Sequence, residues 1–146
     1  MAADLHAVAA DRLRRDGQRY TTSRRMLVEV LDEADRPLTI PEVLGRRDGM
    51  PQSSAYRNLA VLERAGVVER VVTTDEFARY ELAEDLAGHH HHLICTGCGS
   101  VVDVTVGARL ERLIDQAVTR IATDTGYRID DHRLDLIGRC AACLRT

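Results

Sequence analysis

Six potential metal ligands lie within the twelve-residue stretch GHHHHLICTGCG near the middle of the chain. Four consecutive histidines are followed by Cys95 and Cys98, and a second Cys-x-x-Cys pair, Cys140 and Cys143, lies close to the end of the sequence. Imidazole and thiolate groups bind zinc and several other transition metals. The spacing therefore predicts metal binding, and it raises the question of how many ions these side chains share.

The four cysteines favour a metal over disulfides, because the first 20 residues contain no apolar stretch, so that we expect a cytoplasmic protein, and the cytosol keeps thiols reduced. Paired thiolates at this spacing, from two ends of one module, are typical of a closed tetrahedral zinc site. The alternative is four free or redox-active thiols. We expect structural Zn(II) with no open position for chemistry, bound by Cys95, Cys98, Cys140 and Cys143.

The histidine run is expected to form a strand, in which successive side chains point to opposite faces. His89 and His91 then point one way and His90 and His92 the other, so that one run can supply two different metal sites. The alternative is a solvated polar strand edge. Imidazole suits zinc, iron, nickel and copper, so these ligands do not identify the metal.

Two further histidines and several acids could complete such sites. His132 lies eight residues before Cys140 on the expected last strand, where it can come near the histidine run. His6 lies in the first expected helix, and we interpret it as a surface residue without partners. The candidate acidic ligands are Glu69, Glu81, Asp103 and Glu111.

The first half of the chain has the pattern of helices followed by a β-hairpin. The expected helices are residues 2–15, a second capped by Thr21 or Thr22, a third that opens with a Thr39–Glu42 capping box, and a fourth over 53–65 between a Ser53 cap and Gly66. The segments VVERVV and FARYEL form the expected hairpin. This order is typical of a winged helix, in which the helix before the wing enters the major groove.

The expected fourth helix and the arginines before it indicate DNA binding. The net charge is −3, but six arginines between Arg12 and Arg25 face one acid, Asp16, and such a local basic patch can bind phosphate. Arg57 can donate two hydrogen bonds to guanine, and Tyr56 can contact a thymine methyl group or a phosphate. The alternatives are a solvated helix face and a Tyr56 that packs against the preceding helix.

The acidic segment AEDLAG, residues 83–88, is expected to be irregular and to mark a domain boundary. The second half should contain strands at 89–94 and 101–104, a helix at 108–125 and a strand at 127–137. We therefore expect an α+β fold with a first domain at 1–83, a hinge at 84–88 and a metal-binding domain at 89–146. A domain as small as the second usually needs a staple, which a tetrathiolate zinc would supply.

With these motifs the chain resembles the ferric uptake regulator (Fur) family of bacterial metal-dependent repressors over nearly its whole length. GQRYTTSRRMLVEVL is similar to the family's first conserved helix, SSAYRNLAVLERAGVV to its recognition helix, HHHHLICTGCGSVVDV to its metal-binding signature, and DHRLDLIGRCAAC to its C-terminal end. The resemblance implies an N-terminal winged-helix DNA-binding domain joined by a hinge to a C-terminal α/β dimerisation domain.

The resemblance also implies roles for individual residues. It assigns the four cysteines to structural zinc, Glu69, Glu81, His90 and His92 to a sensory site, and His89, His91, Glu111 and His132 to a third site. Asp103 matches an acidic position that peroxide-sensing relatives use for the metal. The implied DNA-binding residues are Arg19 near the minor groove, and Ser54, Tyr56 and Arg57 on the recognition helix.

Two departures from the family pattern leave the sensed metal open. The segment ADRPLT, with Arg36 and Pro37, has no histidine where iron and peroxide sensors often carry a sensory ligand. The segment ELAEDLAG has no cysteine, which zinc sensors of the actinobacterial type use. We expect Fe(II) or Zn(II) as corepressor, with Mn(II) also compatible.

We expect a metal-dependent transcriptional repressor of metal uptake and homeostasis genes, acting as a homodimer on a palindromic double-stranded DNA operator. The alternatives are a peroxide-sensing repressor of the same family and a zinc-stapled adaptor that binds protein. We expect no enzyme, since a metallohydrolase would need a catalytic signature such as HExxH. The sequence has no apolar run of about 18 residues, so we expect a cytoplasmic protein without a membrane partner.

Overall fold

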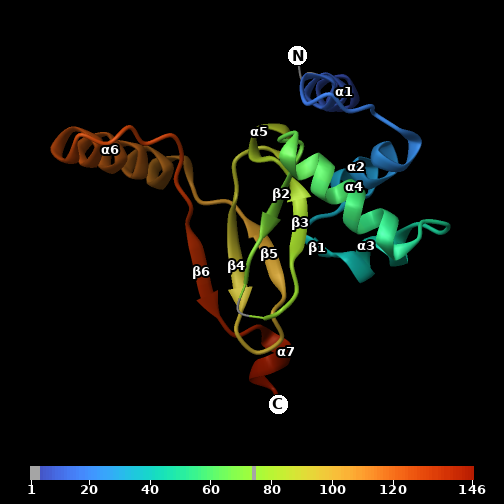
Figure 1. The fold of residues 1–146 in the computed structure, drawn as a ribbon. Coiled ribbons are helices and arrows are strands. Elements are labelled where there is room, and N and C mark those ends of the chain that lie inside the picture. Colours follow the sequence, from blue (N-terminus) through green and yellow to red (C-terminus); the bar gives the residue numbers. More distant parts are fainter. Residues whose placement is uncertain (1–3, 74) are drawn as a thin grey trace.

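Four helices and a three-stranded sheet make up the N-terminal half of the computed structural model, which describes residues 4–73 and 75–146 (Figure 1). The helices are α1 (Leu5–Arg15), α2 (Thr22–Glu33), α3 (Ile40–Arg46) and α4 (Gln52–Arg64). Asp4 caps α1, Thr21 caps α2, and Thr39 forms a reciprocal capping box with Glu42 at α3. The predicted capping box is thus confirmed.

The predicted hairpin is also confirmed, since β2 (Val68–Val71) and β3 (Arg79–Leu82) pair in antiparallel orientation. Their register places Glu69 opposite Glu81. A strand that the sequence did not predict, β1 (Leu38–Thr39), pairs with the other side of β3, so the sheet order is β1-β3-β2. The central position of β3 explains why all four of its residues are buried, including the charged Arg79 and Glu81.

The core of this half lies between the helices and the sheet. Its fully buried side chains include Leu13 on α1, Leu27 on α2, Leu38 in β1, and Leu59 and Leu62 on α4. The opposite face of α4 carries Tyr56 and Arg57, which are exposed. Burial of one face of this amphipathic helix therefore fixes which face is free to meet a ligand.

A second three-stranded sheet, with the order β5-β4-β6, forms the C-terminal half. Its elements are β4 (His91–Cys95), β5 (Val101–Val104), α6 (Ala108–Thr125), β6 (Asp135–Gly138) and α7 (Ala141–Leu144). The antiparallel pairing of β4 with β5 sets His92 opposite Asp103. The parallel pairing of β4 with β6 sets Cys95 opposite Gly138, two residues before Cys140. The central strand β4 thus brings together potential ligands that are distant in the sequence.

The long helix α6 extends away from the second sheet (Figure 1). None of its 18 residues is buried. Leu110, Leu113 and Ile121 on α6 are exposed, as are Leu136 and Ile137 on β6. An amphipathic helix normally buries such a stripe, so this half presents more apolar surface than scattered surface residues would give. No helix of the described residues has both the length and the apolar character needed to cross a membrane.

Two predictions about helices are wrong. The helix α4 begins at Gln52, with Pro51 in the N-cap position, rather than after a Ser53 cap. Proline lacks an N–H group and disfavours helix in the residue before it, so it ends the preceding loop and starts the helix earlier. The supposedly irregular segment contains the one-turn helix α5 (Glu84–Ala87), which begins with two acids, as a helix dipole favours, and ends at Gly88 with φ +92°. Residues 2 and 3 of the first predicted helix lie outside the described residues.

The predicted strands and one histidine also need correction. The first strand of the second half begins at His91 rather than at residue 89, and the last covers only Asp135–Gly138 rather than 127–137. The last strand is short because its pairing with β4 begins at Asp135. His6 is not a free surface residue: it is half-buried, and its Nδ1 lies 2.6 Å from the hydroxyl oxygen of Tyr20.

Candidate metal centres and DNA-binding surface

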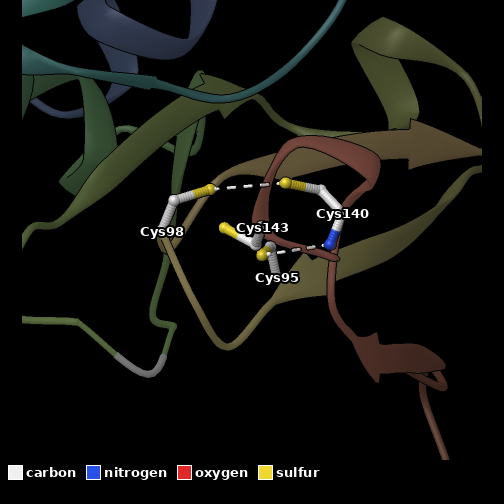
Figure 2. A group of neighbouring side chains, drawn as sticks. All are labelled: Cys95, Cys98, Cys140 and Cys143. Carbon is white, nitrogen blue, oxygen red and sulfur yellow. Dashed lines mark hydrogen bonds between the residues drawn. The ribbon is translucent and has the colours of Figure 1, made fainter. Parts of the chain in front are cut away.

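The four cysteines meet at the end of the second sheet (Figure 2). Cys95 ends β4, Cys98 lies in the turn that follows, and Cys140 and Cys143 come from the start and the body of α7. Their sulfur atoms all lie within 4.8 Å of one another, and those of Cys98 and Cys140 are 3.8 Å apart. A tetrahedral Zn(II) with Zn–S bonds of about 2.3 Å spaces its sulfurs by about 3.8 Å. The sulfur cluster therefore fits zinc.

Backbone N–H groups near the cysteines stabilise the thiolate form of Cys95. The N–H groups of Cys140 and Gly97 each donate to Cys95 Sγ at 3.3 Å, and the Cys140 donor is the main reason that the pKa of Cys95 falls to about 6. Interactions with the other thiols raise the pKa of Cys143 to about 12. Gly97 packs closely against Cys143 and has no room for a side chain, because a Cβ atom there would lie 2.8 Å from Cys143 Sγ.

A second cluster, the Glu81 cluster, consists of Glu81, His90, His92 and Asp103. Glu81 comes from β3 of the first sheet, and the others come from β4, β5 and the residue before β4. The two Glu81 carboxylate oxygens lie 2.8 Å from His92 Nε2 and 3.0 Å from His90 Nε2. Asp103 Oδ1 is buried and has no hydrogen-bond partner within the described part of the chain. A cation in contact with this oxygen would compensate the buried charge, so the donor set fits a metal.

The clustered charges shift the pKa values of this group. Burial, followed by the nearby charge of Glu81, raises the pKa of Asp103 to about 6. The hydrogen bond to Glu81 raises the pKa of His92. Burial lowers the pKa of His90, but the Gly88 carbonyl and the charges of Glu81 and Asp103 outweigh it, so the net shift is upward. Protons therefore compete with a metal for these imidazoles.

A third cluster, the Glu111 cluster, consists of His89, His91, Glu111 and His132. Glu111, in the first turn of α6, lies 2.5 Å from His91 Nε2 and 3.1 Å from His89 Nε2. His132 Nε2 is 3.6 Å from the same carboxylate and, among the described residues, is buried without a hydrogen-bond partner. Three imidazoles around one carboxylate fit a transition metal.

The histidine run therefore divides into the two predicted pairs, although only His91 and His92 lie within β4. His90 and His92 belong to one cluster, and His89 and His91 belong to the other. Glu69 is in neither group of four. It is exposed, and it lines the cavity that Glu81, His90 and His92 also line.

The predicted DNA-binding residues lie on the N-terminal half. Tyr56 is 53% exposed, which argues against its packing on the preceding helix. Arg57 and Arg19 are also exposed, Arg19 in the loop between α1 and α2. Ser54 is half-buried on α4, where its hydroxyl oxygen accepts a hydrogen bond from Asn58.

The ferric uptake regulator family model matches residues 15–137. The chain belongs to this family. It is 30% identical over 138 residues to the ferric uptake regulation protein of Campylobacter jejuni, covering 90% of this chain and 83% of that protein. It is 27% identical over 147 residues to the peroxide operon regulator of Bacillus subtilis, covering 98% and 96%. The Vibrio cholerae ferric uptake regulator structure matches with a TM-score of 0.70 and 26% identity, covering 88% and 96%.

Membership of the Fur family confirms the predicted family and the α+β architecture, with its N-terminal DNA-binding domain and C-terminal dimerisation domain. Fur-family proteins are metal-responsive transcriptional repressors, and they are dimeric DNA-binding regulators rather than enzymes.

Two residues of this Fur-family protein that sequence reasoning missed contact the clusters. Glu84, on α5, contacts His89 Nδ1. Asp135, paired with His92 in the β4–β6 register, has its Oδ1 3.6 Å from His92 Nδ1. A carboxylate on the far nitrogen of a ligand histidine orients the ring. The acidic start of the predicted hinge could have suggested Glu84, but only the strand register reveals Asp135.

Proposed function

We propose that the protein is a metal-dependent transcriptional repressor of metal uptake and homeostasis genes. The observation that carries this proposal is that the Glu81 cluster takes its side chains from both halves of the protein. Glu81 belongs to the winged-helix sheet, whereas His90, His92 and Asp103 belong to the half that carries α6. A cation held there would join the DNA-binding half to the other half.

The proposed mechanism is linkage between metal and DNA. Bound metal favours one arrangement of the two halves, and in a dimer this arrangement sets the separation of the two α4 helices. The metal can shift the equilibrium only by its differential affinity for the two arrangements. A typical coupling is about 1 to 3 kcal/mol, or roughly 5- to 150-fold in DNA affinity.

The donor atoms define the metals to be tested. We assign structural Zn(II) to Cys95, Cys98, Cys140 and Cys143. The Glu81 cluster combines two imidazoles with two carboxylates and no thiolate, which suits Fe(II), Zn(II) or Mn(II). Glu69, on the same cavity, is available as a further oxygen ligand. We assign the Glu111 cluster to a third ion.

We assign the remaining surfaces to contacts with a second copy of the chain and with DNA. We assign the apolar surface of α6 and β6 to a homodimer interface, and Arg19, Ser54, Tyr56 and Arg57 to contacts with double-stranded DNA. A two-fold symmetric dimer reads a palindromic operator, because its two recognition helices meet equivalent half-sites. The proposed domain limits are 1–83, 84–88 for the hinge and 89–146, and the proposed location is the cytoplasm.

Peroxide sensing is the second candidate function. The position of Asp103 in the Glu81 cluster favours it, together with the likeness to the Bacillus subtilis peroxide operon regulator. In this case hydrogen peroxide should abolish DNA binding of the Fe(II) protein but not of the Mn(II) protein. Mass spectrometry should then find an added oxygen atom on a histidine of the Glu81 cluster. A repressor that senses only metal would show neither change.

The test is selection of DNA from a randomised duplex library, without metal and with Fe(II), Mn(II), Zn(II) or Ni(II) under anaerobic conditions. A repressor should enrich a palindromic sequence with one or more metals, and Arg57→Ala and Tyr56→Ala should weaken its binding. If no metal enriches any sequence, the repressor proposal fails. A zinc-stapled adaptor would then be the better description.

A further inference from the structure

Arg24, near the start of α2, connects two parts of the DNA-binding half. Its Nε donates to Asn58 Oδ1 on α4 at 3.0 Å. Its Nη1 donates to the backbone carbonyl of Arg19 at 2.7 Å and to Gln18 Oε1 at 3.3 Å. One guanidinium thus joins the α1–α2 loop to the helix that carries Tyr56 and Arg57. The donors sit on two separate nitrogen atoms in a fixed plane, an arrangement that the single ammonium nitrogen of a lysine does not reproduce.

Arg24 also fixes the direction of a hydrogen-bond relay. A guanidinium can only donate, so the carbonyl oxygen of Asn58 must face Arg24. The Asn58 amide nitrogen then faces Ser54 and donates to its Oγ at 3.2 Å. Asn58 is 8% exposed, so water does not compete freely for its amide. Because Ser54 Oγ accepts in this relay, the hydroxyl hydrogen is directed elsewhere.

The two ends of this network are proposed DNA contacts. Ser54 lies three residues before Arg57 on α4, a spacing that places two side chains on neighbouring parts of a helix surface. Arg19, whose carbonyl Arg24 holds, has an exposed side chain. We propose that Arg24 is a positioning residue, which fixes the Arg19 loop against α4 and, through Asn58, presents the Ser54 hydroxyl to DNA as a hydrogen-bond donor. This inference rests on the proposed function.

Arg24 could instead bind a DNA phosphate directly. Its hydrogen-bond partners, Gln18, Asn58 and the Arg19 carbonyl, are all neutral, so its charge is not compensated by them. The salt dependence of binding separates the two roles. Loss of one phosphate contact lowers the slope of log K against log salt by about 0.9, whereas loss of a positioning group leaves the slope unchanged.

The first experiment compares Arg24→Lys and Arg24→Gln with Arg47→Lys and Arg47→Gln. Arg47 is half-buried in the same half, pairs with Glu29 and Glu33, and makes none of the Arg24 contacts. The probe is the duplex selected with the wild-type protein and its activating metal. Both Arg24 variants should lose about tenfold to hundredfold in affinity for this duplex, with an unchanged salt slope, and both Arg47 variants should bind normally. Affinity equal to that of the Arg47 variants would overturn the inference, and so would a salt slope lowered by about 0.9 in Arg24→Gln, the variant that loses the charge.

The second experiment tests the relay through a variant of nearly the same shape. In Asn58→Asp the new carboxylate still accepts from Arg24 but cannot donate to Ser54, so the hydroxyl must turn and donate to it. Affinity for the selected duplex should fall about tenfold more than affinity for a scrambled duplex. In a Ser54→Ala background this additional loss should disappear. If Asn58→Asp lowers affinity for the selected duplex by the same additional factor in the wild-type and the Ser54→Ala backgrounds, the relay is refuted.

These experiments distinguish the inference from the proposed function. If the wild-type protein selects no duplex with any metal, the repressor proposal itself fails. If the wild-type protein selects a duplex and the Arg24 variants bind it normally, only the positioning role fails. Thermal unfolding and metal titration establish that each variant is folded and binds metal at the assay temperature, since loss of folding would lower affinity for every duplex alike. If Arg24→Gln does not fold, Arg24→Lys and the Asn58→Asp cycle still decide the question.

Discussion

Asp103 Oδ1 lies 3.6 Å from His92 Nε2 across neighbouring strands, yet within the described residues it makes no hydrogen bond. Burial of an oxygen without a partner costs free energy, and it raises the pKa of this carboxyl to about 6. The buried oxygen lacks a hydrogen-bond donor, and we explain this as part of a ligand set that a metal cation would complete.

Asp103→Asn should separate metal binding from folding. The variant removes a buried charge, so the free energy of unfolding of the metal-free protein should stay the same or rise. Its affinity for the activating metal at the Glu81 cluster should fall by about tenfold or more, as expected for loss of a charged ligand. Chemical unfolding and metal titration measure the two quantities. Asp124→Asn, at an exposed position of α6, serves as the control, and a destabilised Asp103 variant with normal metal affinity would contradict the prediction.

His90→Ala and His89→Ala should differ although the two residues are adjacent. His90 belongs to the cluster that joins the two halves, whereas His89 contacts Glu84 and Glu111. We expect His90→Ala to abolish most of the metal-dependent gain in DNA affinity, which is typically about 5- to 150-fold, and His89→Ala to retain most of it. Titration of each variant with metal and the selected duplex measures the gain. Equal losses would mean that the Glu111 cluster also controls DNA binding.

The sequence predicted the parts of this site that depend on short-range regularity. The expected alternation gave the division of His89 and His91 from His90 and His92, although the strand itself begins at His91, and the cysteine spacing predicted one sulfur cluster. It could not predict contacts set by the register of distant strands, such as that of Asp135 with His92. Tertiary packing also overrode local expectation at His6, which meets Tyr20 although its own neighbours suggested a surface position.

The Asp75–Arg79 pair should make stability depend on pH in acid. Asp75 lies 2.8 Å and 2.9 Å from the Arg79 guanidinium, which is buried, and this bond lowers the pKa of Asp75 to about 2. Since the folded pKa lies below the ordinary value of 3.8, the pair stabilises the fold above this value and loses its effect as the pH falls towards about 2. Asp75→Asn should lower the free energy of unfolding at pH 7 by about 1 to 2 kcal/mol.

Urea unfolding from neutral pH downwards measures this effect. The difference between wild type and Asp75→Asn should be constant down to about pH 5 and shrink below it. Asp130→Asn is the control, because Asp130 pairs with Arg128 at an exposed position and should contribute little. A difference that grows as the pH falls would have the wrong sign.

Two glycines beside the cysteine cluster should respond differently to alanine. A Cβ atom at Gly97 would lie 2.8 Å from Cys143 Sγ and 3.1 Å from Cys143 Cβ, whereas one at Gly138 would meet nothing within 4 Å. Gly97→Ala should therefore displace Cys143, lower the zinc content of the purified protein and destabilise the second half, which has few buried residues of its own. Gly138→Ala should retain zinc. Metal analysis and thermal unfolding with and without a chelator test the two variants. Normal zinc content in Gly97→Ala would contradict the prediction that the added methyl group displaces Cys143.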